Sequence, residues 1–425
     1  MELLEELKWR GLLQDYTPGL EELLKKGALK AYAGFDPTAH SLHIGNLVPV
    51  MLLLHFQRHG HVPVVLMGGA TGMIGDPSGK SKERQLLDLG QIEFNLQSQK
   101  KQLEKFIDFS KQKNKAELVN NNDWFADIGF LSFLRDVGKH ITINYMMAKD
   151  SVKSRMDSGI SFAEFTYQLV QGYDFYHLFK NNNVSLQVGG SDQWGNMLTG
   201  TELIRRKDGG EAHVLTAPLI TKADGTKFGK SEGGNIWLDS AMTSPYKFYQ
   251  YWLNTSDEDA VRYVRIFSLK GKEEIETISA QHLLEPHTRL LQKTLAEEMT
   301  IRIHSKAELQ SAVAASMILF GKSTKKELLA LSGSQIQEIF ADVPQFSLKK
   351  SDLTTGIAVV DFLAEQTKVV QSKGEAKRML NSNAISINQE KVTDDKTVNI
   401  DDLLGDAYII VQRGKKNFYL ITVIN

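Results

Sequence analysis

Residues 32–46 have the sequence Tyr-Ala-Gly-Phe-Asp-Pro-Thr-Ala-His-Ser-Leu-His-Ile-Gly-Asn, which predicts a strand, a loop and the start of a helix. Apolar residues alternate with polar or small ones from Leu29 to Ala33, as is typical of a strand. Pro37 and Ser41 then mark a turn, and the apolar run from Leu42 to Phe56 predicts a helix. We take this strand–loop–helix unit as the element around which the rest of the chain is arranged.

The helix start in this stretch fits two interpretations equally. Ser41 is a candidate N-cap, and His43 and Asn46 are three residues apart on one face of the first turn. Unpaired N–H groups at such a helix start attract anions, and Gly45 leaves the backbone open to close approach. These features favour a phosphate site. They are equally typical of an ordinary capped helix with a surface histidine.

A second strand and a glycine-rich loop follow. Residues 62–67 form a near-continuous apolar run, as in strands buried within a parallel sheet. They lead into residues 68–81, which contain five glycines. Strand, loop and helix in this order predict a βαβ unit, and hence an α/β fold with a Rossmann-like parallel sheet.

The glycine-rich loop does not match the common nucleotide motifs. Gly75 and Gly79 enclose three residues, whereas a P-loop needs four before its Gly-Lys-Ser, and the other glycine spacings do not fit Gly-x-Gly-x-x-Gly. We therefore expect these glycines to let the backbone pass close to a bound small molecule, with Asp76 facing it.

Composition limits the class of protein. The 425 residues suffice for two or three domains, and 42% hydrophobic and 24% charged residues with a net charge of −1 indicate a globular chain. Any nucleic-acid binding must therefore come from local patches. The absence of cysteine excludes disulfides, thiol catalysis and cysteine-ligated zinc. No apolar run approaches the ~20 residues of a membrane span and the N-terminus lacks signal-peptide character, so we expect a cytoplasmic protein without a membrane partner.

Further polar groups are expected at one edge of the sheet. Three of them fall at i, i+4 and i+7 on the helix predicted over 162–174, a stripe that fits either an exposed helix face or a polar-lined pocket. Others lie at or beyond the end of the strand predicted over 184–188, and ligands of open parallel sheets bind beyond the carboxyl ends of strands. The residues expected there are Tyr167, Gln171, Asp174, Gln187, Asp192 and Gln193.

A loop rich in glycine and lysine follows the last strand predicted for this sheet, residues 213–220. Residues 221–234 contain Lys227 and Lys230. A lysine in a loop is usually only solvated. Two lysines in a mobile, positively charged loop at the end of a sheet are nevertheless suited to clamp a triphosphate.

Two of these segments together resemble the signatures of class I aminoacyl-tRNA synthetases. Residues 41–46, Ser-Leu-His-Ile-Gly-Asn, look like the His-Ile-Gly-His signature, and residues 227–231, Lys-Phe-Gly-Lys-Ser, look like the Lys-Met-Ser-Lys-Ser loop. Either match alone is weak, but the pair stands in the right order, one after an early strand and one after the last. The blocks at 32–38, 75–79 and 189–196 resemble those of bacterial tyrosyl-tRNA synthetases, and the resemblance covers essentially the whole chain.

The resemblance and the pattern of elements together predict a catalytic domain, a helical domain and a small α+β module. The expected boundaries are a Rossmann-like catalytic domain at 1–220 with a helical insertion near 82–155, a mobile lysine loop and connection at 221–243, a helical domain at 244–340, a linker at 341–355 and a ribosomal-protein-like RNA-binding module at 356–425.

The resemblance implies a tyrosine–tRNA ligase. Tyrosine and ATP would form tyrosyl-adenylate and pyrophosphate, and the tyrosyl group would then pass to the 3′ end of tRNA(Tyr). The tyrosine carboxylate is itself the nucleophile, so donors and lysines that stabilise charge on the phosphates suffice without a general base. Mg²⁺ is expected to be carried by the ATP phosphates, with no protein-bound metal. A homodimer is implied by the resemblance and by an aromatic cluster near Trp124.

By resemblance, the site residues fall into four groups. Tyrosine would be bound by Tyr32 and Asp174 at its phenol oxygen, by Asp76, Tyr167 and Gln171 at its ammonium group, and by Gln187 and Gln193. ATP would be contacted by Asp36, Thr38, His43, Gly45, Asn46, Asp192 and Lys230. The groups expected to act in catalysis are Thr38, His43, Asn46, Lys80, Arg84, Lys227, Lys230 and Ser231. The RNA contacts expected in the C-terminal module are Lys373, Lys377, Arg378, Arg413, Lys415 and Lys416.

The chain departs from the family pattern at both signatures. Asn46 stands in place of the second histidine, so that it can donate a hydrogen bond but cannot become cationic. Phe228 and Gly229 replace Met and Ser in the lysine loop. Pro49 removes a backbone donor early in the predicted helix, where we expect a kink or a loose helix start.

Two other interpretations remain open. An RNA-binding protein that keeps the synthetase fold without its activity would be marked by loss of the phosphate contacts, yet the chain retains His43, Asp76, Lys227 and Lys230. A tryptophanyl-specific relative would have no use for the pair Tyr32 and Asp174, because an indole has no phenol oxygen.

Overall fold

The computed structural model describes residues 1–76, 87–110, 113–156, 159–231, 234–319, 328–329, 331–341, 343–414 and 417–424. The chain divides into two compact units. We call Met1–Thr243 with Gln250–Ile303 the N-terminal unit, and Ser244–Tyr249 with His304–Asn425 the C-terminal unit. No helix in the described ranges is long and apolar enough to cross a membrane.

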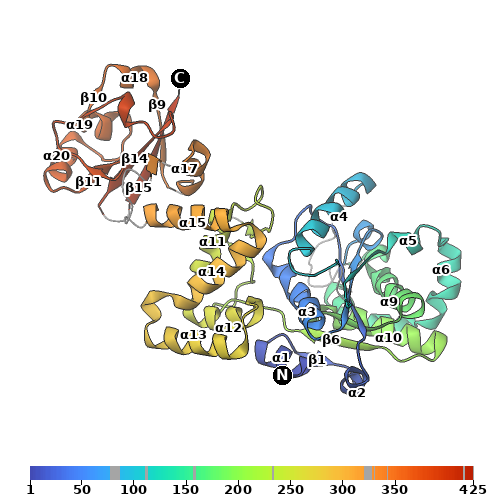
Figure 1. Ribbon diagram of the computed structural model, residues 1–425. Coiled ribbons are helices and arrows are strands. Elements are labelled where there is room, and N and C mark those ends of the chain that lie inside the picture. The colour runs from blue at the N-terminus through green and yellow to red at the C-terminus, as the bar shows by residue number, and fades with distance from the viewer. Residues whose placement is uncertain are drawn as a thin grey trace. The chain divides into compact units, whose positions relative to one another are not determined.

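A six-stranded sheet forms the centre of the N-terminal unit (Figure 1). Five strands are parallel, and the two-residue edge strand β1 is antiparallel to β6. The chain runs outward from β2 to β4 and then returns to β5 and β6 on the other side of β2, so this is the doubly wound arrangement that the sequence predicts. The strands in order across the sheet are β1 (Asp15–Tyr16), β6 (His213–Ala217), β5 (Val184–Gly190), β2 (Lys30–Phe35), β3 (Val62–Met67) and β4 (Glu117–Asn120).

Helices cover both faces of this sheet. On one face lies α3 (Leu47–Arg58), which packs against β2, β3 and β5 and has nine of its twelve residues buried. Figure 1 shows α9 (Phe162–Asn182) and α10 (Trp194–Asp208) on the opposite side. Because side chains alternate between the faces of a strand, Tyr32 of β2 points towards α9 and shares a buried cluster with Phe175 and Met197.

Helix α9 is fixed at both ends. The Ser161 Oγ accepts a hydrogen bond from the Glu164 N–H at 3.2 Å, as in a capping box. Glu164 is itself buried and bonded by both terminal nitrogens of Arg155, at 2.9 and 3.0 Å. Asn183 ends the helix with a φ of 57°, a conformation that asparagine tolerates. The polar residues that α9 carries therefore have a fixed register against the sheet.

The segment 82–155, predicted as a helical insertion, also supplies a strand of the main sheet. β4 pairs in parallel with β3, from Val64↔Glu117 to Met67↔Asn120. The prediction missed it because a four-residue edge strand between polar runs gives little periodic signal. The described helices of this segment are α4 (Leu89–Leu103), α5 (Asn122–Phe125), α6 (Phe130–Asp136), α7 (Ile143–Met147) and α8 (Asp150–Met156).

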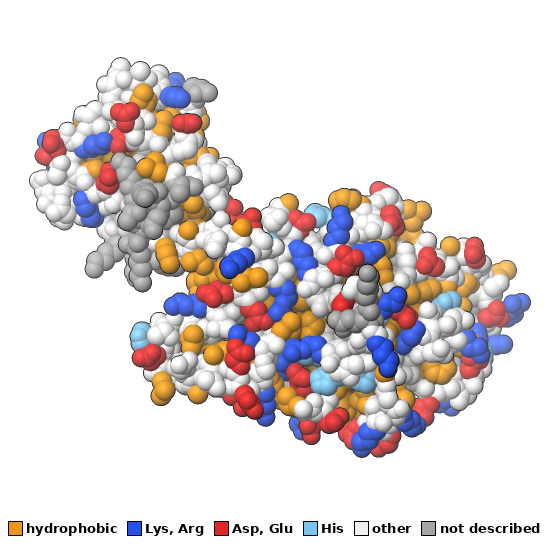
Figure 2. All heavy atoms as spheres, viewed as in Figure 1, with side chains coloured by type: hydrophobic (Ala, Val, Ile, Leu, Met, Phe, Trp, Pro, Cys, Tyr) orange, Lys and Arg blue, Asp and Glu red, His pale blue; other side chains and the backbone are white. Residues whose placement is uncertain are grey.

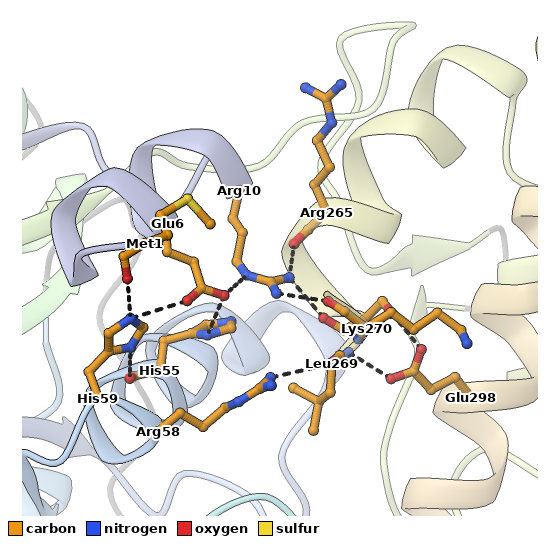
Figure 3. Close-up of polar contacts among 11 residues, drawn as sticks. Met1, Glu6, Arg10, His55, Arg58, His59, Arg265, Leu269, Lys270 and Glu298 are labelled. Carbon is orange, nitrogen blue, oxygen red and sulfur yellow. Dashed lines mark hydrogen bonds and ion pairs between the residues drawn. The ribbon is translucent and has the colours of Figure 1, made fainter. Parts of the chain in front are cut away.

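One buried arginine ties helix α1 (Leu3–Arg10) to the helices that end the N-terminal unit (Figure 3). Arg10 is 2% exposed and pairs with Glu6 at 2.7 Å. Its guanidinium also donates, over 2.8, 2.9 and 3.0 Å, to the backbone carbonyls of Arg265, Ser268 and Lys270. The last carbonyls of a helix have no N–H partner within that helix, and the Arg10 guanidinium supplies donors at and just beyond the end of α12. The helices here are α12 (Asp257–Phe267), α13 (Lys272–Leu284) and α14 (Leu290–Ile303), preceded by α11 (Pro245–Leu253).

In the C-terminal unit, the segment 341–355 is not a linker but part of a five-stranded sheet. β9 (Gln345–Lys349) pairs in parallel with β15 (Asn417–Ile424), and Leu348 is buried in the core. Apolar residues at alternate positions, Phe346 and Leu348, fit such a strand, whereas the prediction rested only on the break that precedes it. The sheet has the order β12 (Glu390–Lys391), β11 (Ile385–Ile387), β14 (Tyr408–Arg413), β15, β9.

Short helices and strands complete the C-terminal unit. The core under the sheet includes Phe362 and Leu363 of a single π-helical turn, Phe362–Gln366. Further helices and strands of this unit are α15 (Lys306–Leu319), α17 (Gly333–Ile339), α18 (Lys350–Thr354), α19 (Val359–Asp361), α20 (Lys373–Asn381), β10 (Ile357–Ala358) and β13 (Thr397–Val398).

Candidate active site

A cleft of about 920 Å³ opens in the N-terminal unit at the carboxyl ends of β2 and β5, the switch point of the sheet. All seven residues predicted to bind tyrosine line it, and so do six of the seven predicted to contact ATP. Lys227 lines it as well, whereas Lys230 does not. The lining residues from these sets are Tyr32, Asp36, Thr38, His43, Gly45, Asn46, Asp76, Tyr167, Gln171, Asp174, Gln187, Asp192 and Gln193.

Tyr32 and Asp174 lie buried together at one part of the cleft. The Tyr32 hydroxyl has no hydrogen-bond partner among the described residues. The Asp174 carboxylate accepts from the Trp124 indole N–H at 2.9 Å and from the Asn121 amide at 3.1 Å. Burial raises the pKa of Asp174 to about 8, although these two hydrogen bonds lower it. Burial and the nearby Asp174 also raise the pKa of Tyr32.

Asp36 connects the strand β2 with helix α9. It accepts from the Thr71 hydroxyl at 2.7 Å and from the Tyr167 hydroxyl at 3.0 Å. Burial, followed by the charge of Asp36, raises the pKa of Tyr167 well above its ordinary value. A Cβ on Gly68 would lie 2.2 Å from an Asp36 oxygen. From the sequence, the glycines of this loop are expected to make room for a bound small molecule. Gly68 instead makes room for the Asp36 side chain.

A second carboxylate, Asp76, is bonded by residues of the segment that follows β5. It accepts from the Gln193 amide at 2.6 Å and from the Asn196 amide at 3.5 Å. The Oε1 atoms of Gln171 and Gln187 are buried without a hydrogen-bond partner in the described structure. Burial and the charge of Asp76 raise the pKa of Asp192. The cleft thus gathers several carboxylates and unpaired amide oxygens, which suit a ligand that carries an ammonium group.

The first signature begins with a 3₁₀ turn instead of a regular helix. η1 (Ile44–Asn46) precedes α3, and the His43 N–H donates to the Asn46 Oδ1 at 3.0 Å. The predicted helix start at Leu42 with Ser41 as its cap is therefore wrong: Ser41 Oγ instead donates to the Leu42 carbonyl at 2.7 Å. Pro49 is the third residue of α3, where a backbone N–H has no intrahelical partner to lose.

Gly45 is required by its neighbours. A Cβ there would lie 2.9 Å from the His43 ring, so the space beside the glycine is taken by that imidazole. The edge of the same ring meets Trp237, with 5.7 Å between ring centroids. The backbone after the lysine loop runs beside the signature, and the Ile44 N–H donates to the Ile236 carbonyl at 3.0 Å.

The lysine loop is anchored through its phenylalanine. Phe228 is 4% exposed, stacks on Phe267 with 5.3 Å between centroids, and contacts Tyr263 edge-on at 4.9 Å. The Gly229 N–H donates to the Tyr251 hydroxyl at 3.1 Å, and Gly229 has a φ of 82° that favours glycine. The departures from the family loop thus replace Met and Ser with an aromatic anchor and a turn glycine.

Some predicted residues do not join the cleft. Lys230 is exposed at the start of β7 (Lys230–Ser231), which pairs with β8 (Gly234–Asn235). The backbone of Ser231 belongs to the same strand. Lys80, Arg84, Lys415 and Lys416 lie outside the described residues.

Sequence reasoning missed several polar residues that shape the site: Thr71, Asn121, Trp124, Asn196 and Trp237. Two of them follow β4, the strand that the prediction did not include. Had the run of three asparagines at 120–122 been placed at the end of a strand, it would have pointed to this edge of the sheet.

In the C-terminal unit, the predicted RNA contacts differ in their surroundings. Lys373 is paired with Asp361 at 2.7 Å and with Glu365 at 2.9 Å. Arg413 donates to the Val369 carbonyl at 3.1 Å. Lys377 and Arg378 are instead exposed on α20, and their side chains form neither kind of contact with the described residues. Figure 2 shows basic and acidic side chains mixed over the visible face of this unit.

Comparisons with known proteins cover both units. The family described as tRNA synthetases class I (W and Y) matches residues 24–321, and a tyrosine–tRNA ligase C-terminal domain matches residues 335–421. The chain is 56% identical to a tyrosine–tRNA ligase of Porphyromonas gingivalis over the full length of both, and 56% identical to one of Cytophaga hutchinsonii over 98% of both.

Solved structures resemble about three quarters of the chain. A C-terminally truncated mitochondrial tyrosyl-tRNA synthetase of Aspergillus nidulans superposes with a TM-score of 0.67 at 33% identity, over 75% of this chain and 94% of that one. A tryptophanyl-tRNA synthetase of Plasmodium falciparum reaches a TM-score of 0.52 at 15% identity, over 79% and 87%, which shows a shared fold only.

Proposed function

Because the chain belongs to the tyrosine–tRNA ligases of the class I aminoacyl-tRNA synthetases, we propose that the cleft residues divide the work of this reaction between a tyrosine end and an ATP end. The ligase activates L-tyrosine with ATP and then transfers the tyrosyl group to tRNA(Tyr). In the first step a tyrosine carboxylate oxygen bonds to the α-phosphorus, while the bond from that phosphorus to the pyrophosphate oxygen breaks.

One observation supports the tyrosine end: the buried hydroxyl of Tyr32 lies beside Asp174 and has no hydrogen-bond partner among the residues that the structure describes. Tyr32 donates to the phenol oxygen of the substrate, and Asp174, oriented by Trp124 and Asn121, accepts a hydrogen bond from the phenol O–H. Phenylalanine would leave these groups unpaired. Sites that bond a substrate hydroxyl reject the analogue lacking it by roughly 10⁴–10⁵, a range for which tyrosine-activating enzymes are themselves a known example.

The ammonium group of tyrosine binds among the carboxylate and amide oxygens nearby. Asp76 is held by Gln193, and the buried Oε1 of Gln171 has no hydrogen-bond partner in the described part of the chain. The Tyr167 hydroxyl is bonded to Asp36 and presents its oxygen to the same cleft. With Gln187, these groups fix the orientation of the carboxylate that attacks ATP, and such positioning lowers the barrier without acid–base chemistry.

The ATP end uses the two signatures. Thr38, His43 and Asn46 contact the phosphates and ribose, with Asp36, Gly45 and Asp192 beside them. The cationic groups Lys80, Arg84, Lys227 and Lys230, with Ser231, stabilise the charge that spreads over the α-phosphate and the leaving pyrophosphate. Mg²⁺ binds in such sites mainly through substrate phosphates and keeps several waters, so we propose that it enters with ATP.

The C-terminal module supplies a surface for tRNA. Of the predicted contacts, Lys377 and Arg378 are exposed on α20 and suit phosphate binding, whereas Lys373 and Arg413 are already engaged by groups of the module itself. Because its substrates are those of translation, we expect the protein to act in the cytoplasm.

A homodimer is proposed from the exposed apolar side chains of α6 and α7. The predicted aromatic cluster packs within the chain, since Phe125 and Phe133 both contact Tyr173. Phe130 and Leu131 are instead 62% and 78% exposed, and exposed apolar groups of this kind mark interfaces. Sedimentation equilibrium should show a dimer that Leu131→Asp weakens, and a monomer in the unaltered protein would refute it.

The test of the function is amino-acid-dependent exchange of pyrophosphate into ATP in the absence of tRNA. Tyrosine should support exchange, and tryptophan and phenylalanine should not at equal concentrations. Exchange with tryptophan but not with tyrosine would favour a tryptophan-specific enzyme. No exchange with any amino acid, together with retained tRNA binding, would favour an inactive RNA-binding protein.

A further inference from the structure

Helix α4 directs three buried amide side chains at the loop that carries the first signature. Asn95, Gln99 and Gln102 follow one another at i, i+4 and i+7, so they share one face of the helix. They are 1%, 2% and 7% exposed. Amides are seldom buried to this degree unless their hydrogen bonds are made inside the protein.

Each amide bonds the loop between β2 and η1. The Asn95 side chain donates to the Pro37 carbonyl at 2.8 Å, and that of Gln99 donates to the Ala39 carbonyl at 2.9 Å. Gln102 accepts from the Leu42 N–H at 2.8 Å. Its amide nitrogen donates to the Ser41 hydroxyl at 3.1 Å. Residues 37–42 have no regular secondary structure, so these side chains take the place of backbone pairing.

The same contacts reach the segment that leaves the lysine loop. The Ser41 hydroxyl bonded by Gln102 also accepts from the Asp239 N–H at 3.1 Å. The Leu238 N–H donates to the Leu42 carbonyl at 2.9 Å. Gln102 therefore fixes the point at which the start of the first signature meets the segment that follows the lysine loop.

Most of this amide face lies outside the cleft. Thr38 and His43 line the cleft, whereas Asn95 and Gln102 do not. Two of the three amides therefore hold the backbone of the ATP-binding loop from behind, without a place in the cleft themselves. Gln99 both holds the loop and reaches the cleft.

We propose that Asn95, Gln99 and Gln102 are positioning residues for ATP, which act by fixing the backbone that presents Thr38 and His43. This inference rests on the proposed function and adds residues of α4 to it. Misplacement of a binding group by about 1 Å can cost about 100-fold in rate, so loss of one amide is expected to impair the use of ATP without affecting the tyrosine end of the cleft.

The test compares Gln102→Met with Gln97→Met in the full-length protein. Methionine has nearly the size of glutamine and makes no such hydrogen bonds, and Gln97 is exposed on the same helix. For Gln102→Met we expect kcat/KM for ATP in pyrophosphate exchange to fall about 10- to 100-fold. Tyrosine Kd, measured by equilibrium dialysis, should change less than about twofold, and Gln97→Met should match the unaltered protein in both.

A double-variant cycle identifies the route of the effect. If Gln102 acts through His43, adding Gln102→Met to His43→Ala should cost far less than it does alone, because coupled residues are non-additive. Should Gln102→Met fail to fold, Asn95→Leu takes its place with the same expectations; it removes the bond to the Pro37 carbonyl and the bond from the Gln91 amide.

Three results would overturn the proposal. They are an unchanged kcat/KM for ATP, a parallel loss of tyrosine binding, and full additivity with His43→Ala. Failure of the proposed function would look different, since the unaltered protein would then show no tyrosine-dependent exchange.

Discussion

At the scale of single residues, the cleft holds polar groups that the folded chain leaves unpaired. The Tyr32 hydroxyl and the Oε1 atoms of Gln171 and Gln187 are buried without partners among the described residues. Each such group costs about 1–3 kcal/mol of stability. Groups of this kind are retained where a ligand restores their hydrogen bonds, and all three line the cleft. Without tyrosine, these groups therefore lower the free energy of unfolding at the position where tyrosine is proposed to bind.

Tyr32→Phe tests this trade-off. Removal of an unpaired buried hydroxyl should leave the melting temperature equal or higher in the absence of tyrosine. The variant should lose one hydrogen bond to the substrate, worth about 1 kcal/mol, so kcat/KM for tyrosine should fall about fivefold. Pyrophosphate exchange and differential scanning fluorimetry measure the two effects. A lower melting temperature with unchanged kinetics would mean that the hydroxyl is structural.

Asp174 makes stability depend on pH. An aspartate ordinarily has a pKa of 3.8, whereas burial raises the pKa of Asp174 in the folded protein to about 8, because burial disfavours the carboxylate. The folded state therefore binds this proton more tightly, and the stability so gained is lost as pH rises from about 4 to about 8. Asp174→Asn lacks this loss. Its melting temperature relative to the unaltered protein, measured without ligands, should rise from pH 5 to pH 8 and then level off.

A constant offset between the two proteins over that range would contradict the raised pKa. An offset is expected in addition, because asparagine offers a single oxygen to the two donors, Trp124 and Asn121. Only the change of the difference with pH is therefore informative.

At the scale of elements, periodic patterns predicted the long and buried segments well. Strand β3 has the bounds that its apolar run predicts, and α9 begins at Phe162 as expected. β4 and β9 were missed because short strands are defined by the neighbour with which they pair, and that pairing leaves little trace in their own residues. The amides of α4 gave no signal, since their partners lie in a loop that stands 58–61 residues earlier in the chain.

The site was predicted where residue types carry the chemistry, and missed where they only support it. Tyr32 was assigned to the site through the family resemblance, and Asp174 through the polar stripe of its helix together with that resemblance; both line the cleft. Trp124 and Asn121, which orient Asp174, were not assigned a role there. A tryptophan or asparagine near a strand end has many possible partners, and only the fold selects one.

Phe228 joins the lysine loop to α12, and this element-scale contact is testable. Phe228→Ala should create a cavity beside Phe267 and Tyr263 and destabilise the protein by about 3–5 kcal/mol. Phe228→Met, which restores the residue of the family signature, should cost less than about 1.5 kcal/mol. Thermal denaturation compares the two. Equal losses for both would show that packing at this position does not anchor the loop.

At the scale of the whole molecule, the two units limit how the role of the C-terminal module can be tested. Deletion from residue 356 onward would remove β15 and leave β9 without its partner in the sheet. It would also expose the cluster in which Ile336 and Phe340 pack against Phe418. Single surface substitutions keep this unit intact and are therefore the better probe of tRNA binding.

The double variant Lys377→Ala/Arg378→Ala should weaken tRNA binding without affecting tyrosine activation. Each phosphate contact contributes about 0.7–0.9 to the slope of log K against log salt, so loss of two should lower that slope by about 1.5. Lys373→Ala is the matched control, because the ammonium of Lys373 is already paired with Asp361 and Glu365. Filter binding of tRNA(Tyr) from 50 to 200 mM salt, a range in which phosphate contacts dominate affinity, gives the slopes. Equal effects of the control and the double variant would place the RNA contacts away from the exposed face of α20. A loss of pyrophosphate exchange in the double variant would show that the two substitutions disturb the folded structure rather than RNA binding alone.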